Sequence, residues 1–266
     1  MPAIYAHRRF GEETAKLLSP SLQALIKTYE EAFQLGTQGP DILFYYKPLK
    51  RNDTRSHGTA IHAKEGKEVF DELYEIWNTQ GKAENAFLVY VLGYLCHFTL
   101  DALCHKYIDD NSSKALSHGK IESEFDKFIL RKDGKKIRGY NTARAFSGEN
   151  GCKEACALAM DEDEEKIARA IQTIKTINGM FSCKVELFHG VAHLFLRLAK
   201  MERAFGDMFL HKKDDPLCTE INEVLYKKWQ TGIAVAVEII EAFVSSNTPI
   251  TNELFRCNFS GIIKED

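Results

Sequence analysis

Three polar side chains recur every four residues in an otherwise apolar stretch of the chain. They are His97, Asp101 and His105, and the stretch runs from Asn85 to Asp109. Because four residues complete about one turn of an α-helix, the three side chains would share one helix face. A carboxylate buried among apolar side chains is costly unless a counter-charge or a metal compensates it. Two imidazoles beside that carboxylate indicate a metal site.

The length of this pattern predicts more than one metal ion. His97 and His105 would lie roughly 12 Å apart along a helix, which is too far for one ion with ligand bonds of about 2 Å. We therefore expect His97 to bind one ion and His105 another, with the Asp101 carboxylate able to bridge two ions. Pairs of metal ions are common in enzymes that carry out in-line displacement at phosphorus.

A second pair with the same spacing follows, formed by His118 and Glu122. Such a pair alone is often only a weak surface contact on a helix. Together with His105, however, it makes a set of two histidines and one glutamate, which is known for catalytic zinc and leaves one coordination position open.

Further candidate ligands precede the apolar stretch. Asp41 follows a Gly-Pro pair, where it could also simply cap a turn. His7 lies near the N-terminus, and His57 and His62 lie near the start of the next predicted helix. His57 and His62 compete for one ligand position, and the spacing from Asp41 favours His57.

The order and spacing of these residues resemble the zinc-dependent phospholipase C family of bacteria. The resemblance covers about residues 1–125 and consists of an N-terminal His, then Asp, then His, then HxxxD followed by His on one helix, then HxxxE. It implies an all-helical fold and a phosphodiester hydrolase that uses two or three zinc ions to activate water for attack on phosphorus. A small phosphodiester or a phospholipid is the implied substrate.

The resemblance also implies how the ligands are shared among the ions, with Asp41 doubling as a catalytic base. The first zinc would be held by Asp41, His57, His97 and Asp101, the second by His105, His118 and Glu122, and the third by Asp101, His7 and the N-terminal amino and carbonyl groups.

Two other functions stay open at this point. Fungal single-strand-specific zinc nucleases share the site architecture, and Phe44, Tyr45 and Tyr46 beside Asp41 could bind substrate by stacking on bases. The net charge of −3 speaks against stable nucleic-acid binding. The third hypothesis is a helical interaction protein whose zinc is purely structural, with closed coordination.

Helical periodicity dominates the rest of the chain. Few prolines and glycines and the absence of alternating strand patterns predict one all-α domain over residues 1–266, with about eight or nine helices. Residues 1–130 would form the metal-binding half, 131–151 a loop and 152–266 additional helices. The expected helices are 12–35 (one or two), 58–80, 84–108, 114–130, 153–160, 162–178, 183–205 and 216–244.

The stretch 131–151 is rich in glycine and basic residues, which predicts a surface loop. Within it Arg138, Tyr140 and Arg144 could bind a phosphate. A solvated loop is the interpretation that the composition favours.

Composition and local sequence patterns speak against a membrane-spanning or a secreted protein. No uncharged apolar run is long enough to mark a membrane span. The N-terminal segment has no signal-peptide pattern, and the seven cysteines are odd in number and contain no CxxC. We therefore expect reduced thiols and a cytoplasmic location, and the sequence does not indicate an oligomeric state.

Overall fold

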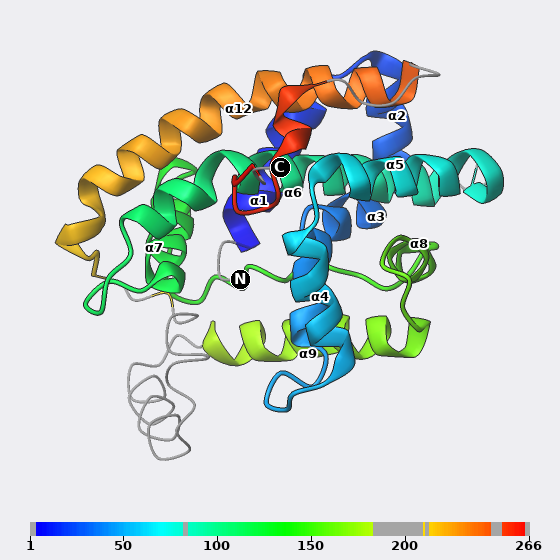
Figure 1. The fold of residues 1–266 in the computed structure, drawn as a ribbon. Coiled ribbons are helices and arrows are strands. Elements are labelled where there is room, and N and C mark those ends of the chain that lie inside the picture. Colours follow the sequence, from blue (N-terminus) through cyan, green and yellow to red (C-terminus); the bar gives the residue numbers. More distant parts are fainter. Residues whose placement is uncertain (1–3, 82–84, 183–209, 211–212, 246–251, 264–266) are drawn as a thin grey trace.

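The computed structural model describes residues 4–81, 85–182, 210, 213–245 and 252–263 (Figure 1). These residues form ten α-helices with short 3₁₀ and π segments, and they contain two isolated β-bridges but no strand. The prediction of an all-α fold is confirmed, with slightly more helices than expected. The helix expected over 183–205 lies outside the described residues.

The first half of the chain carries most of the predicted ligands. Its elements are α1 (Ile4–Ala15), α2 (Pro20–Thr28), α3 (Glu30–Gly36), η1 (Gly39–Tyr45), α4 (Asp53–Ala63), α5 (Gly66–Ile76), η2 (Trp77–Gly81), α6 (Asn85–Asp110) and α7 (His118–Lys132).

The second half adds further helices that pack on the first. They are α8 (Cys152–Ala159), α9 (Glu164–Phe181), η4 (Pro216–Cys218), α12 (Thr219–Ser245) and η5 (Glu253–Arg256). Helix α8 contacts α3 and α6, α9 contacts η1, and α12 contacts α1, α6 and α7.

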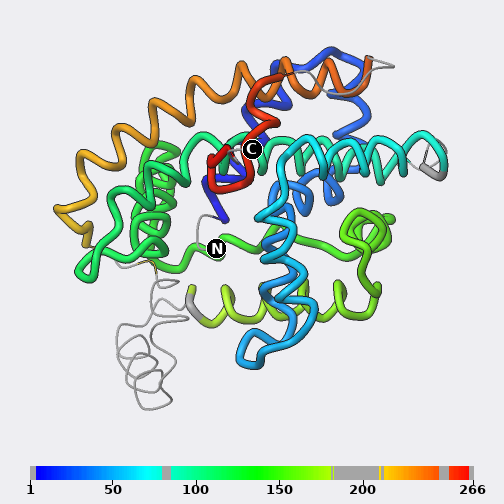
Figure 2. The backbone as a smooth tube through the Cα atoms, in the orientation of Figure 1, coloured from blue at the N-terminus to red at the C-terminus, as the bar shows by residue number. Residues whose placement is uncertain are grey.

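Helix α6 lies at the centre of the fold, with α12, α1, α3 and α8 packed around it (Figures 1 and 2). Its residues from Phe87 to Ala102 are all buried, including His97 and Asp101. By length and composition α6 could cross a membrane, but 94% of its most apolar window is buried inside the protein. A helix that is apolar on every side is expected at the core of an all-helical protein.

Two glycines allow α3 and α6 to approach closely. A Cβ atom on Gly36 would lie 2.1 Å from the Tyr90 carbonyl oxygen, and one on Gly93 would lie 2.3 Å from the Phe33 carbonyl oxygen. Real side chains do not tolerate such distances to backbone atoms. The missing side chains therefore bring the end of α3 and residue Thr37 against the face of α6 that carries His97.

Side-chain caps fix the helices that carry the other candidate ligands. The Asn52 side chain accepts a hydrogen bond from the Arg55 amide at the start of α4, and Ser117 accepts one from the Lys120 amide at the start of α7. Such caps satisfy amide groups that the first turn of a helix leaves unpaired. The cap of α7 holds His118 in the first turn.

The prediction of a surface loop over residues 131–151 was incomplete, and residues 252–263 are also anchored on the core. Residues 131–151 do not form only a surface loop, because Ile137, Ala143 and Phe146 are buried. Residues 252–263 contain η5, and Phe255 and Phe259 of this segment pack against Phe98 on α6. Both segments are anchored by contacts with residues distant in the sequence, which local patterns do not reveal.

The six described cysteines are free thiols, as expected. Burial raises the pKa of Cys96 and of Cys104 to about 12. Thiols with such pKa values are inert packing groups rather than nucleophiles.

Candidate metal centre

The predicted row of His97, Asp101 and His105 is present on one face of α6, with Asp101 in the middle. The Asp101 Oδ1 atom lies 3.1 Å from Nε2 of His7 and 3.1 Å from Nε2 of His105, while Oδ2 lies 3.1 Å from Nε2 of His97. The Asp101 side chain is 2% exposed. One buried carboxylate therefore faces three imidazoles, two from its own helix and one from α1.

The hydrogen bond between His97 Nδ1 and Thr37 leaves the other ring nitrogen, Nε2, facing a carboxylate. Nδ1 of His97 lies 3.2 Å from the Thr37 carbonyl oxygen, which can only accept, so Nδ1 carries the proton. In the neutral ring Nε2 is then an acceptor. Neither His97 Nε2 nor Asp101 Oδ2 has a hydrogen-bond partner among the described residues, although the two atoms are 3.1 Å apart. Two buried acceptors in this arrangement fit a cation between them.

A second cluster joins η1, α4 and α6. It consists of Asp41, His62 and His97, whose ligand atoms lie within 4.8 Å of one another. His62 donates Nδ1–H to the Gly58 carbonyl at 2.7 Å and turns Nε2 toward Asp41 Oδ1 at 3.1 Å. A backbone carbonyl that fixes the tautomer of a histidine is typical of metal sites.

The third cluster joins α6 and α7 through His105, His118 and Glu122. Glu122 Oε1 lies 3.3 Å from Nε2 of His105 and 3.2 Å from Nε2 of His118. On the other side of its ring, His118 holds its Nδ1 2.6 Å from Asp109 Oδ1. Asp109 thus orients His118 from one side of the ring and leaves Nε2 on the other side to bind a metal. This order of carboxylate, histidine and metal is common in zinc sites.

His57, preferred from its spacing, does not reach this centre. Its Nε2 lies 2.9 Å from the Met160 carbonyl oxygen on the side of α8. The structure brings His62, the competing residue, to Asp41 instead. Five residues of helix rotate a side chain by about 140°, so His57 and His62 cannot face the same centre.

A glycine turn accommodates the ring of His97. Gly39 has a φ of +49°, and a Cβ atom there would lie 2.4 Å from Cδ2 of His97. The left-handed backbone and the missing side chain both require glycine. The Gly-Pro pair noted before Asp41 therefore shapes the wall beside His97.

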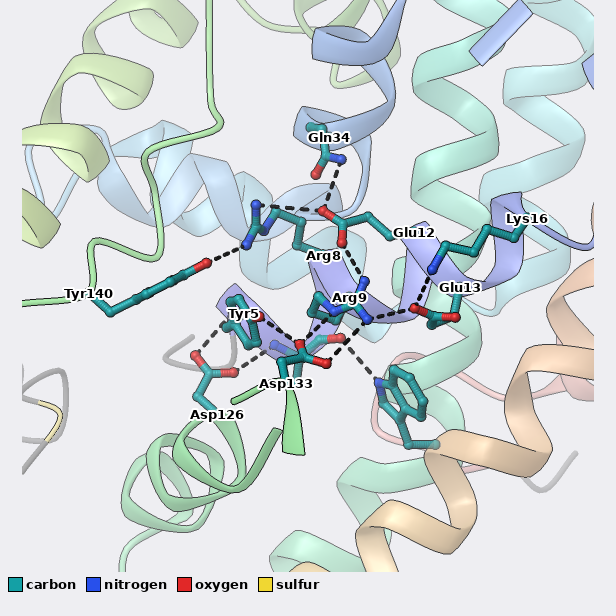
Figure 3. A network of polar contacts seen from close by, with 12 residues as sticks. Tyr5, Arg8, Arg9, Glu12, Glu13, Lys16, Gln34, Asp126, Asp133 and Tyr140 are labelled. Atoms are coloured by element: carbon teal, nitrogen blue, oxygen red, sulfur yellow. Dashed lines mark hydrogen bonds and ion pairs between the residues drawn. The ribbon is translucent and has the colours of Figure 1, made fainter. Parts of the chain in front are cut away.

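Asp126 holds the N-terminal turn of α1 against α7. Its two carboxylate oxygens accept hydrogen bonds from the backbone amides of Tyr5 at 3.1 Å and Ala6 at 2.8 Å (Figure 3). This contact positions His7 one residue later. Sequence reasoning missed Asp126, although it continues the four-residue spacing of His118 and Glu122.

Opposing charges govern the protonation of the buried ligands. Burial alone would raise the pKa of Asp101, but the imidazoles of His105, His97 and His7 hold it well below its usual range. Burial would likewise lower the pKa of His105, yet the Asp101 and Glu122 carboxylates raise it well above its ordinary value. For His7, burial has the largest effect and lowers the pKa, although the Asp101 carboxylate opposes it.

The aromatic residues beside Asp41 divide into two groups. Tyr45 and Tyr46 are buried, which leaves neither ring as an open platform for stacking on bases. Phe44 is half-buried and packs on His62 with ring centroids 5.4 Å apart. Phe259, from the C-terminal segment, contacts the other side of the site at 5.2 Å from the His62 ring.

An all-helical fold that gathers imidazoles and carboxylates into adjoining buried clusters is typical of helical zinc hydrolases. The family described as zinc-dependent phospholipase C matches residues 6–172, and the chain belongs to this family. The match extends beyond the N-terminal 125 residues that carried the resemblance and includes α8 and part of α9. No curated protein and no solved structure matches the chain.

Proposed function

We propose that the protein is a phosphodiester hydrolase with a di- or trinuclear zinc centre built around Asp101. The observation that carries the proposal is the buried approach of His97 Nε2 and Asp101 Oδ2, two atoms without a hydrogen-bond partner in the described structure. A cation at this position would satisfy both atoms. Imidazole and carboxylate donors at several adjoining positions fit zinc.

The geometry supports an assignment of ligands to ions. Since Nδ1 of His97 is bonded to Thr37, only Nε2 is left to bind a metal. We assign His97, Asp101 Oδ2 and the pair Asp41–His62 to the first ion, so His62 replaces His57. His7 and Asp101 Oδ1 would contribute to a further ion, together with the N-terminal groups, which lie outside the described residues.

The ion at the far end of α6 has its own ligands. His105, His118 and Glu122 would bind it, as the spacing predicted. Asp101 Oδ1 also faces His105 at 3.1 Å, which makes Asp101 the natural bridge between the two ends of the centre.

Zinc bound here would supply Lewis-acid activation of water for attack on phosphorus. The protein contributes a carboxylate that accepts a proton from the attacking water, and this proton is returned to the alcohol that leaves when the ester P–O bond breaks. Asp41 suits this role because its side chain is 18% exposed, whereas that of Asp101 is 2% exposed. Although burial favours the neutral acid, His62 helps to hold the pKa of Asp41 below its usual range, so Asp41 stays ionised at neutral pH.

The substrate class is a small phosphodiester, such as a phospholipid headgroup. Phe44 beside His62 offers an apolar contact next to the first ion. Tyr45 would not stack on a substrate, since its ring is buried.

Hydrolysis of p-nitrophenyl phosphocholine tests the proposal. We expect activity that is lost in chelator and restored by added zinc, and we expect Asp101→Asn to abolish it. Asp110→Asn is the matched control, because Asp110 is on the same helix but exposed and paired with Lys106. Hydrolysis that survives both chelation and Asp101→Asn would contradict the proposal.

A further inference from the structure

A cleft lined by basic side chains opens beside α1, apart from the metal clusters. Its volume is about 350 Å³, and α1 contributes one wall while the segment after α7 contributes the other. Its charged lining residues are Arg8, Arg9, Glu12, Asp133, Lys135 and Arg144. Four cations and two carboxylates leave a formal charge of +2 on this lining.

Arg8 is buried in the wall of this cleft with an unmet hydrogen-bonding capacity. The residue is 7% exposed, and its Nε–H has no acceptor in the described part of the chain. Its Nη2 donates to the Tyr140 hydroxyl at 3.0 Å, and its Nη1 lies 3.5 Å from Glu12 Oε1 (Figure 3). A buried guanidinium with a missing acceptor favours an anion.

Aromatic rings hold Arg8 and Arg144 in place. The Arg8 guanidinium carbon lies 5.0 Å from the centroid of Tyr5, and that of Arg144 lies 5.0 Å from the centroid of Tyr140. The two tyrosine rings meet edge to face at 5.2 Å. Stacked guanidinium groups lose less freedom when they bind a ligand, so the two arginines are preorganised.

The acidic residues of the cleft are largely engaged by another arginine. Arg9 pairs with Asp133 at 2.7 Å, with Glu12 at 2.6 Å and with Glu13 at 2.6 Å. No carboxylate oxygen of the described residues lies within 4.0 Å of a side-chain nitrogen of Lys135 or Arg144. The excess positive charge of the lining therefore lies on Lys135 and Arg144, while Arg8 and Arg9 share Glu12.

We infer that this cleft binds a phosphate group, with Arg8, Arg144 and Lys135 as its charged contacts. The formal charge of +2 matches a phosphate monoester or inorganic phosphate, and arginine forks suit phosphate oxygens. The phosphate would be either a free anion or the terminal phosphate of a lipid headgroup.

The cleft is separate from the metal centre. His7 and Arg8 are consecutive on α1, so their side chains point about 100° apart. His7 faces Asp101, whereas Arg8 faces Tyr140 and Glu12. A phosphate in the cleft would therefore contact a different face of α1 from the one that His7 turns toward Asp101.

Calorimetric titration of the full chain with inorganic phosphate tests the inference. The double variant Lys135→Gln/Arg144→Gln removes two exposed cations, and we expect it to bind phosphate at least about ten-fold more weakly. Arg169→Gln is the matched control, because Arg169 is an exposed arginine on α9 that pairs only with Glu165 at 3.3 Å among the described carboxylates. The control should bind phosphate as the unchanged protein does.

The zinc centre could itself bind phosphate, so the titration is repeated in chelator. We expect the cleft to bind phosphate there too, with the same loss in the double variant. Vesicles of phosphatidylcholine with and without phosphatidic acid then separate the sources: binding only to phosphatidic acid vesicles assigns a lipid phosphate, and no vesicle binding assigns a free anion. Equal phosphate affinity in the unchanged protein and the double variant would overturn the inference.

Discussion

The partners of the histidine ring nitrogens define the centre at the scale of single residues. His97 donates Nδ1–H to Thr37 and His62 donates Nδ1–H to Gly58, while His118 turns Nδ1 to Asp109. In each case Nε2 is directed at a carboxylate. This is how metal-binding histidines are oriented in other proteins, and it explains why polar groups of this kind are tolerated beside an apolar helix.

The two histidines of α4 provide a matched pair of variants. We expect His62→Gln to weaken zinc binding by more than about 100-fold, because even loss of an outer hydrogen-bond partner costs 10–100-fold. His57→Gln should leave zinc affinity unchanged, since His57 bonds to Met160 instead. Competition with a zinc-binding dye measures both affinities. The reverse result would restore His57 as the ligand.

Proton release should accompany zinc binding. The pKa of His105 is raised above its ordinary value, so in the metal-free protein this imidazole is protonated at neutral pH and must lose its proton to bind zinc. Zinc affinity should therefore rise with pH until the pKa of His105 is passed, and fall on acidification. Titration in weakly buffered solution with a pH indicator records the released protons. An affinity that is the same at pH 6 and pH 8 would contradict this expectation.

The spacing of residues predicted the ligands on α6 and α7 but could not decide between His57 and His62. The residue types and order of the ligands on α6 and α7 follow from four-residue spacing alone. Which face of α4 turns toward Asp41 depends on tertiary packing. Gly58 sets that face, because a Cβ atom there would lie 3.2 Å from Leu43 Cβ in η1, and His62 follows Gly58 by one turn.

At the scale of elements, the close approach of α3 and α6 supports the centre. Gly93→Ala would place a methyl group against the Phe33 carbonyl and the Thr37 amide. We expect it to lower the free energy of unfolding by about 3 kcal/mol, the upper end for overpacked sites. Thermal or urea unfolding measures the change.

Gly148→Ala is the control for this variant, because the nearest atom to an added Cβ lies 3.8 Å away. It should change stability by less than about 0.5 kcal/mol. Equal stability of Gly93→Ala and Gly148→Ala would show that the contact between α3 and α6 is not tight.

Elements with a continuous apolar pattern were predicted well, and those anchored at a distance were not. The helix expected over 84–108 is found as α6 (Asn85–Asp110). The region 12–35, expected to form one or two helices, contains one break between α1 and α2 and another at Tyr29 between α2 and α3. The burial of Phe146 and the contact of Phe259 with the site could not be predicted, because both depend on partners far away in the sequence.

At the scale of the whole molecule, the centre brings together side chains from five segments that lie far apart in the sequence. Its candidate ligands come from α1, η1, α4, α6 and α7. Since these segments meet only in the folded state, zinc binding and folding are linked.

Chelation should therefore lower thermal stability. With zinc at 1,000 times its dissociation constant, the folded state gains about 4 kcal/mol, so removing zinc should lower the unfolding midpoint by roughly 10 °C. Asp101→Asn protein should respond much less to chelator. A midpoint that does not move in the unchanged protein would mean that zinc does not contribute to its stability.

The zinc content of the purified protein, measured by elemental analysis, tests the central claim most directly. The three clusters around Asp101 predict two to three zinc ions per chain. Protein that contains no zinc after purification and binds none when zinc is added would contradict the claim.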